Sequence, residues 1–257
     1  KIKEKLIKQQ SLIMSNILKK LILSFSFLIF ITNLAFSEET KSDVVETTPS
    51  DFNTSAYEVQ IYDPFEPINR VVFKFNNVAD RVVLEPAAKG YRKLPSPVQS
   101  GVGNFFSNLK LPLVIVNQFL QGQFGNAAAS TGRLLINTTV GIAGLVDIAE
   151  KFGLEEMEED FGQTLATWGV PSGPYIVLPI FGPSNLRDAA GRFITASTDP
   201  VNIYLADQGE GELIFYRTAG TAVEQRAKII DEVNTLRENS VDYYAAVRSS
   251  YNQNRIA

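Results

Sequence analysis

The sequence predicts a mostly α-helical protein that folds as a single domain of short amphipathic helices with one irregular segment. Apolar residues recur every three or four positions over most of the chain beyond residue 61, which is the spacing of an amphipathic helix. Glycines and prolines gather between residues 169 and 183, where they forbid a long helix. The length of 257 residues and the apolar content of 45% suit one globular domain.

The first residues of the chain are predicted to direct export. Residues 1–13 precede Met14 and are interpreted as a non-native upstream extension. Residues 14–37 combine a basic start, an apolar run and two small residues, Ala35 and Ser37, before the expected cut, which is typical of a signal peptide. The apolar run has 16 residues, fewer than a spanning helix needs, and an uncleaved anchor is the alternative.

Residues 38–61 are acidic, rich in serine and threonine, and without apolar periodicity. This composition predicts a disordered linker. The linker leads into a main helical domain over residues 62–208 and then into a C-terminal helical region over residues 209–257.

The first helix of the main domain is predicted to begin at Pro67 and to end at Pro86, because proline suits a first turn and disrupts a helix interior. Ser96 and Pro97 form a cap and first-turn pair for a second helix. An almost wholly apolar segment follows over residues 111–122.

A helix is also predicted from residue 124, but the β-branched run over residues 136–140 leaves its end open. Within the glycine- and proline-rich segment, the run YIVL over residues 175–178 favours a short extended piece. Ser184 is expected to cap the helix that follows. Residues 211–255 show helical periodicity and are interpreted as two helices, or one long one.

Composition excludes several classes of function. The chain contains no histidine and no cysteine, so it offers no Ser-His-Asp triad, thiol nucleophile or Cys/His zinc site. Residues 1–37 hold six basic residues and one acidic residue, so their removal leaves 18 basic and 27 acidic residues, a net charge of −9. A chain this acidic, with no basic stripe, is not expected to bind nucleic acid.

Two patterns could carry catalysis, and neither is convincing. Ser107 and Lys110 fit the S-x-x-K spacing of serine acyl-transfer enzymes, but the companion motifs of those enzymes are absent. The acidic run over residues 155–160 offers carboxylates, although neighbouring acids repel one another and favour a solvated turn. We therefore expect no enzyme, no metal site and no cofactor.

Several longer motifs occur in a fixed order from Asp63 to Leu205. They read DPFEPINRVVFKFN, NFFSNLKLP, NQFLQG, GRLLINTTVGIAGLVDIA and EDFGQTLATWGVPSGPYIVLPIFGPSNLRD. Together they resemble the MlaA family, also called VacJ, of the system that maintains the lipid asymmetry of the bacterial outer membrane.

The resemblance implies a ring-like helical bundle, membrane-embedded or membrane-associated, in the inner leaflet of the outer membrane. Such a ring surrounds an amphipathic channel that takes mislocalised phospholipids from the outer leaflet and passes them to a soluble periplasmic carrier. It also implies association with trimeric porins. Short amphipathic helices suit a protein that lies in the plane of a membrane.

The resemblance also suggests residues that line or gate the lipid path. In the first motif these are Asn69, Arg70, Phe73 and Phe75. A structural role is the alternative for this motif, with Phe75 in the core and Asn69 as a local cap.

The glycine- and proline-rich stretch is expected to shape the rim or wall of the path. Its apolar candidates Tyr175, Ile176, Leu178 and Phe181 would face lipid or core. Arg187 and Asp188 form either a structural pair or a polar element near the passage.

One feature departs from the family. Its members carry a cysteine at the signal cleavage site that is acylated to anchor the protein, whereas this chain has none. Attachment is therefore expected to rest on the amphipathic helices, on a porin or on an uncleaved signal, and a peripheral periplasmic protein is the alternative location. A porin-associated scaffold that moves no lipid, and a lipid hydrolase that uses carboxylates or the pair Ser107 and Lys110, are the alternative functions.

Overall fold

The computed structural model describes residues 61–256. The predicted upstream extension over 1–13 and the predicted signal peptide over 14–37 lie outside the described residues. So does the predicted linker over 38–61, apart from its last residue. The predictions for these segments therefore remain predictions.

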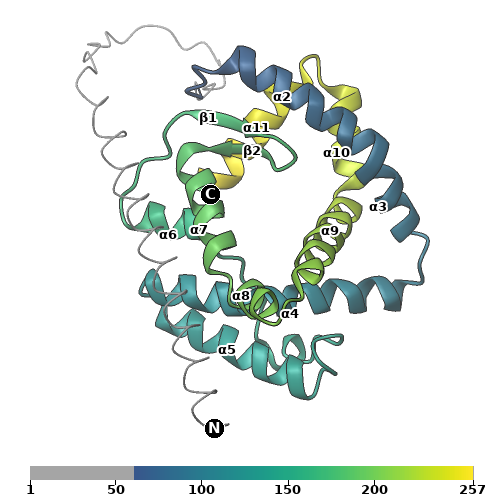
Figure 1. The fold of residues 1–257 in the computed structure, drawn as a ribbon, viewed down its shortest axis with the longest axis vertical. Coiled ribbons are helices and arrows are strands. Elements are labelled where there is room, and N and C mark those ends of the chain that lie inside the picture. Colours follow the sequence, from purple (N-terminus) through teal and green to yellow (C-terminus); the bar gives the residue numbers. More distant parts are fainter. Residues whose placement is uncertain (1–60, 257) are drawn as a thin grey trace, which may run out of the picture.

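The described chain is mostly helical, and its elements follow one another around a ring (Figure 1). The first part of the ring comprises α2 (Glu66–Ala79), the π-helical turn η1 (Asp80–Leu84), α3 (Glu85–Tyr91), α4 (Ser96–Leu120), α5 (Phe124–Thr139) and η2 (Glu150–Phe152). The second part comprises α6 (Phe161–Thr167), β1 (Tyr175–Leu178), β2 (Gly182–Asn185), α7 (Leu186–Thr198), α8 (Pro200–Asp207), α9 (Gly211–Lys228), α10 (Ile230–Asn239) and α11 (Tyr243–Ile256). The prediction of a single, mostly helical domain is confirmed.

The first helix begins as predicted but does not end at Pro86. Pro67 lies in the first turn of α2. The chain then passes through η1 and continues as α3, and Pro86 lies in the first turn of that helix. Proline is tolerated there because a first-turn N–H has no partner within its own helix, and the wider π turn before it makes room for the pyrrolidine side chain.

The capping residues at the starts of two other helices differ from the prediction by one residue. Ser96 is the first residue of α4 and makes no capping hydrogen bond, while Pro97 lies in the first turn as expected. The segment over 111–122 continues this helix, which includes Pro112 in its interior. At α7 the cap is Asn185 rather than Ser184, because the Asn185 side chain accepts the Asp188 N–H at 2.7 Å.

The extended run YIVL forms β1, which pairs antiparallel with β2 from Tyr175 opposite Asn185 to Leu178 opposite Gly182. The C-terminal region contains three helices, α9, α10 and α11, rather than one or two. The chain turns at Ile229 between α9 and α10, and Ser240 ends α10.

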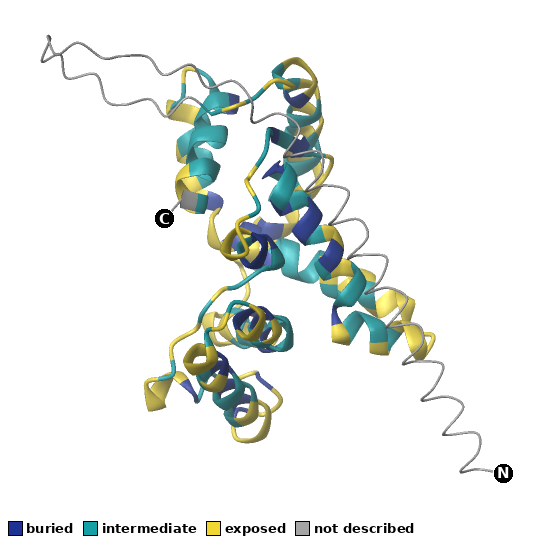
Figure 2. Cartoon of the chain, turned by 90° about the vertical axis from the view of Figure 1, so that its left-hand side faces the viewer, coloured by how far each residue is buried: buried dark blue, intermediate teal, exposed yellow. Residues whose placement is uncertain are grey.

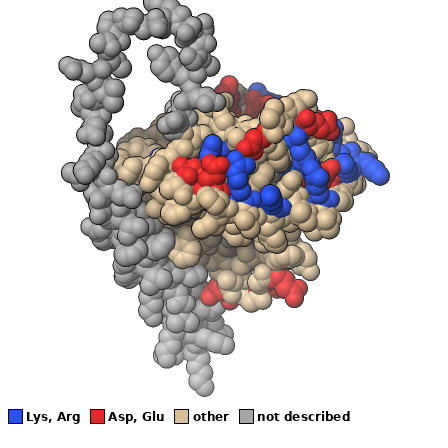
Figure 3. All heavy atoms as spheres, turned by 90° about the horizontal axis from the view of Figure 1, so that it is seen from above, with Lys and Arg blue, Asp and Glu red and all other residues tan. Residues whose placement is uncertain are grey.

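The two ends of the described chain meet where α11 returns to the start of α2. Arg248 bonds Asp63 at 2.8 Å and Glu66 at 3.3 Å, and Arg70 bonds Asp242 at 2.6 Å. Seen from above, this side of the ring carries basic and acidic side chains close together (Figure 3). These contacts join residues more than 170 positions apart and close the ring.

The interior is unusually polar and the exterior unusually apolar. Buried residues form short patches on several helices rather than one central mass (Figure 2). One apolar cluster joins Ala88, Ala227 and Ile230, and another joins Tyr175, Val177 and Tyr244. Buried polar or charged side chains include Gln118, Ser130, Arg133, Asn137, Thr164, Asp188, Asp199, Glu224 and Arg226.

Exposed apolar side chains form stripes along single faces of two helical segments. On α2 and η1 the stripe comprises Ile68, Val71, Phe75, Val78 and Val82. On α4 it comprises Val98, Phe105, Val116 and Phe119. Within residues 61–256, no helix combines the length and the apolar character that a membrane span requires.

Asp80 on η1 joins α2, α9 and α10. Its carboxylate accepts hydrogen bonds from Arg226 at 2.7 Å and from Arg237 at 2.8 Å, and all three side chains are mostly buried. Burial alone would raise the pKa of this carboxyl, but the two guanidinium groups outweigh burial and hold the pKa below its usual value.

Asp80→Asn should lower the free energy of unfolding by about 3 kcal/mol at pH 7, because it leaves two mostly buried guanidinium groups without a carboxylate. The folded-state pKa of Asp80 lies below its unfolded value. Its contribution is therefore present above about pH 4 and is lost as the pH falls further. Urea unfolding at pH 7 measures the loss of stability caused by the substitution. Repeating it at pH 3.5 measures the effect of acid, and the variant should lose less stability than the unchanged protein when the pH falls from 7 to 3.5.

The matched control is Asp231→Asn, which removes an exposed ion pair with Arg92. Exposed pairs contribute little, so this variant should unfold at nearly the same urea concentration as the unchanged protein. An equal loss in both variants would contradict the structural role of Asp80.

Candidate functional site

The β-hairpin is fastened to α2 by two asparagine side chains. Asn69 is buried and donates to the Tyr175 carbonyl at 3.1 Å, while its carbonyl oxygen accepts the Val177 N–H at 2.9 Å. Two helical turns later, Asn76 donates to the Leu178 carbonyl at 2.9 Å and accepts the Ile180 N–H at 2.7 Å. Asn69 thus occupies the edge of β1 that β2 leaves unpaired, and Asn76 fastens the end of β1 and the turn that follows.

The tip of the hairpin is strained and exposed. Ile180 adopts a left-handed backbone conformation with φ of 69°, which is unfavourable for a β-branched residue. Besides the bond from Asn76, Arg192 on α7 donates to the Phe181 carbonyl at 3.1 Å. The side chains of Ile180 and Phe181 are both mostly exposed, so the strain presents apolar groups to the surroundings.

The outer face of α2 has the opposite character to its inner face. The asparagines point toward the hairpin, whereas Phe75 lies in the exposed apolar stripe with 56% of its surface exposed. The alternative that places Phe75 in the core is therefore wrong, and Asn69 is a long-range clamp rather than a local cap. Phe73 faces inward and contacts the rings of Tyr243 and Tyr244 with centroids 5.2 and 5.5 Å away.

Arg70 belongs to a charged group at the closure of the ring. It bonds Glu66 at 2.8 Å and Asp242 at 2.6 Å and lies 4.4 Å from the centre of the Tyr244 ring. The Arg70 guanidinium holds the pKa of Asp242 below its usual value against a smaller effect of burial. Arg70 therefore has structural partners, and none of these contacts leaves its charge free for a ligand.

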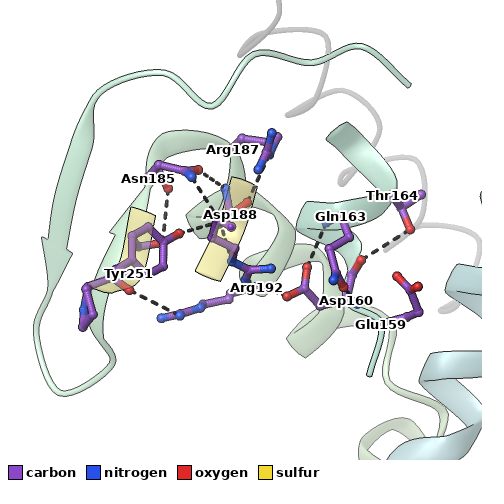
Figure 4. A network of polar contacts seen from close by, with 12 residues as sticks. Glu159, Asp160, Gln163, Thr164, Asn185, Arg187, Asp188, Arg192 and Tyr251 are labelled. Atoms are coloured by element: carbon purple, nitrogen blue, oxygen red, sulfur yellow. Dashed lines mark hydrogen bonds and ion pairs between the residues drawn. The ribbon is translucent and has the colours of Figure 1, made fainter. Parts of the chain in front are cut away.

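Asp188 is the centre of a polar network between the hairpin, α7 and α11 (Figure 4). Its fully buried carboxylate accepts bonds from Arg187 at 3.0 Å, from Asn185 at 3.1 Å and from the hydroxyl of Tyr251. Arg255 lies 3.0 Å from Asp188 and 2.7 Å from Asp160. Arg187 and Asp188 thus form a structural pair, and α11 supplies the additional donors.

Asp160 belongs to the same region and fixes the start of α6 (Figure 4). Its side chain accepts the Gln163 N–H at 2.9 Å, and the Gln163 side chain accepts the Asp160 N–H at 2.7 Å. This reciprocal pair is a capping box. It converts the end of the acidic run over residues 155–160 into an ordered wall rather than a free turn.

A cavity of about 700 Å³ lies beside this network. Its volume is in the range of sites for small molecules. One wall is the inner face of α4, and the others come from residues 156–160, α6, α7, α9 and α11. The lining mixes apolar, polar and charged groups: Ser107, Lys110, Leu111, Leu113, Val114, Asn117, Glu156, Met157, Glu158, Glu159, Asp160, Gln163, Thr195, Gln225, Tyr251, Asn254 and Arg255.

The predicted candidates therefore divide between the hairpin and the closure of the ring. Asn69 lies against Tyr175 on the buried side of β1, whose residues Ile176 and Leu178 are partly buried. Phe75 and Phe181 are exposed. None of the predicted site residues lines the cavity.

Sequence reasoning missed Asn76, Tyr251 and Arg255. The spacing of seven residues between Asn69 and Asn76 places both on one helix face and could have indicated a shared partner. The partners of Tyr251 and Arg255 are more than 60 positions away, and no local pattern indicates them. Ser107 and Lys110 both line the cavity, as helical spacing of three residues allows.

Taken together, the fold and the cavity define a helical ring with exposed apolar stripes and a cavity of mixed polar and apolar lining. The family model described as MlaA lipoprotein matches residues 61–257. This protein belongs to the MlaA lipoprotein family.

Individual relatives agree with this assignment. The intermembrane phospholipid transport system lipoprotein MlaA of Haemophilus influenzae is 37% identical over 201 residues, which are 75% of this chain and 77% of the relative. The protein of that name from Escherichia coli is 34% identical over 196 residues, 74% of this chain and 76% of the relative. A protein of Rickettsia typhi is 38% identical over 201 residues, 77% of this chain and 78% of the relative.

A solved structure described as "Structural basis for maintenance of bacterial outer membrane lipid asymmetry" has a similar fold. It superposes with a TM-score of 0.66 at 36% sequence identity and covers 75% of this chain and 96% of its own.

Asn69→Ala should lower the free energy of unfolding by about 2–4 kcal/mol, because it leaves the Val177 N–H and the Tyr175 carbonyl buried without a partner. Urea unfolding monitored by circular dichroism measures this loss. The control Asn126→Ala removes an exposed asparagine whose side chain bonds only Gln123 at 2.7 Å, and it should change stability little. Similar losses in the two variants would show that Asn69 does not fasten the hairpin.

The buried tyrosines predict a loss of stability at alkaline pH. Burial raises the pKa of Tyr251 to about 12, and its bond to Asp188 adds to the shift. Burial and the charge of Asp63 likewise raise the pKa of Tyr175 and of Tyr244. The pKa values of these tyrosines are higher in the folded than in the unfolded protein. Their neutral hydroxyls therefore contribute fully to stability below about pH 10, and this contribution is lost as the pH rises toward 12.

Tyr251→Phe should make this alkaline loss shallower by about 1 kcal/mol per pH unit between pH 10 and pH 12. Urea midpoints at half-unit steps of pH measure the slope. Tyr204→Phe, at an exposed tyrosine, should leave the slope unchanged. An equal slope for all three proteins would contradict the assignment to Tyr251.

Proposed function

We propose that this protein is a phospholipid transport component that lies in the inner leaflet of the outer membrane and surrounds a path for lipid. In this role it takes mislocalised phospholipids from the outer leaflet and passes them to a soluble periplasmic carrier, next to a trimeric porin. The names of two relatives support the substrate, since these proteins are intermembrane phospholipid transport system lipoproteins. The protein itself needs no cofactor for this movement.

The observation that carries the proposal is the reversed polarity of the ring. In a protein surrounded by water, a contiguous stripe such as that from Ile68 to Val82 would be buried. Here the stripe is exposed, while Asn69 on the other side of the same helix is buried against the hairpin. Apolar stripes on α2 and α4 suit a ring that sits among acyl chains in one leaflet, with its backbone hydrogen bonds satisfied internally.

The cavity supports a path for an amphipathic molecule. Leu111, Leu113 and Val114 offer apolar surface for acyl chains, while Ser107, Gln225 and Asn254 offer polar groups for a head. The strained hairpin tip adds exposed Ile180 and Phe181 as further apolar surface of the protein. These groups favour the movement of lipid over the alternative function of a porin-associated scaffold, because a scaffold needs no cavity.

We assign the hold on the membrane to the exposed apolar stripes, with the porin as a second contact. A peripheral periplasmic protein would need the same stripes to be covered by a partner.

Phe75→Ser should weaken binding to phospholipid vesicles about tenfold or more, because burying one phenylalanine side chain contributes about 1.5–3 kcal/mol. The free energy of unfolding should change little, since Phe75 is already exposed. Sedimentation with vesicles measures binding. Lys74→Ser, at the adjacent exposed position, is the control and should bind normally. Unchanged binding of the Phe75 variant would exclude the α2 stripe from the membrane contact.

The function itself is tested by labelling phospholipid amines in the outer leaflet of intact cells with an impermeant reagent. Deletion of the gene should increase the label, and the cloned copy should reverse the increase. No change, with the protein present and exported, would overturn lipid removal and favour the scaffold.

A further inference from the structure

The cavity wall on α4 contains one cation without an ion-pair partner. Ser107, Lys110, Leu111, Val114 and Asn117 lie on one side of the helix, the side that lines the cavity. Lys110 is partly buried there and makes no ion pair with any residue in the described part of the chain. The other lining cation, Arg255, is already bonded to Asp160 and Asp188.

Carboxylates line the cavity on the segment over residues 156–160. Two of them have partners, since Asp160 bonds Arg255 and Glu159 accepts a bond from Gln121 at 2.8 Å. Glu156 and Glu158 have no hydrogen bond or ion pair within residues 61–256. The ammonium of Lys228 is near enough to interact with both, but it is bonded to Glu224 at 2.7 Å.

The cavity therefore presents one unpaired positive charge, two unpaired negative charges and an apolar strip made by Leu111, Val114 and Met157. We propose that this cavity prefers phospholipids whose headgroup carries an ammonium, with the phosphate at Lys110 and the ammonium at Glu156 and Glu158. This inference rests on the proposed function and names the substrate class of the same path.

A headgroup without an ammonium fits less well. Phosphatidylglycerol can offer its phosphate to Lys110, but it brings no positive charge to Glu156 and Glu158. Its net negative charge is then held next to two carboxylates, which is unfavourable. Phosphatidylethanolamine places its phosphate at Lys110 and its ammonium at the two carboxylates. The preference then comes from attraction of the ammonium and from repulsion of the phosphatidylglycerol charge.

The test uses the purified full chain in neutral detergent with equal amounts of phosphatidylethanolamine and phosphatidylglycerol, followed by extraction and mass spectrometry of the bound lipid. Phosphatidylethanolamine should be enriched about three- to tenfold, the size expected of partly exposed ion pairs. The double variant Glu156→Gln and Glu158→Gln should lose this enrichment but still bind lipid. Lys110→Gln should bind less of both lipids.

The matched control is Glu155→Gln, an exposed carboxylate of the same segment that does not line the cavity, and it should keep the enrichment. Bound lipid in the ratio supplied, or enrichment that survives the double variant, would overturn the preference. Glycerophosphoethanolamine carries the same headgroup without acyl chains. If it displaced the lipid at equal concentration, the ligand would be a free headgroup and the lipid assignment would be wrong.

The failure of the preference is distinguishable from failure of the proposed function. If lipid is bound in the supplied ratio while deletion still raises the outer-leaflet label, only the preference is wrong. If no phospholipid is bound and the label does not change, the proposed function is wrong as well.

Discussion

The structure depends on the fastening of one strand edge by side chains of a helix. A strand in a two-stranded hairpin has one edge without a partner, and its N–H and carbonyl groups still need hydrogen bonds. Asn69 and Asn76 provide them, because an amide carries a donor and an acceptor and can bond a strand as a neighbouring strand would. This arrangement requires the polar face of α2 to point inward. The apolar stripe of α2 is then left exposed. The exposed stripe therefore follows from the way the asparagines fasten the hairpin.

Directional bonds rather than a large apolar core fix the shape of this ring. The apolar clusters are small, and the elements between them are joined by carboxylates that each hold two or more donors, as Asp80 and Asp188 do. Removing one partner of such a buried group is costly, which makes alternative arrangements unfavourable. The polar interior that these bonds require also provides the mixed walls of the cavity.

Local rules predicted much of the fold and little of the site. Pro67 placed a helix start and the YIVL run placed a strand, because both depend on backbone preferences of a few residues. Periodicity identified α2 as amphipathic, but it cannot tell which face is buried, and the packed face proved to carry Asn69 and Asn76 beside Phe73. The resemblance identified Asn69, whereas its partners more than 100 positions away could come only from the structure. Pro86 misled because a π turn allows a helix to resume.

The contact between α11 and α2 has a consequence for how the ring is made. Arg248 and Asp63 are 185 positions apart, so their pairing closes a loop that contains nearly all of the described chain. Contacts between such distant residues form slowly, because the entropy of the intervening chain must be lost first. The ring therefore stays open until the last helix has been synthesised and has docked. During that interval the cavity has no α11 wall, and a chain cut short before Tyr243 would remain an open arc.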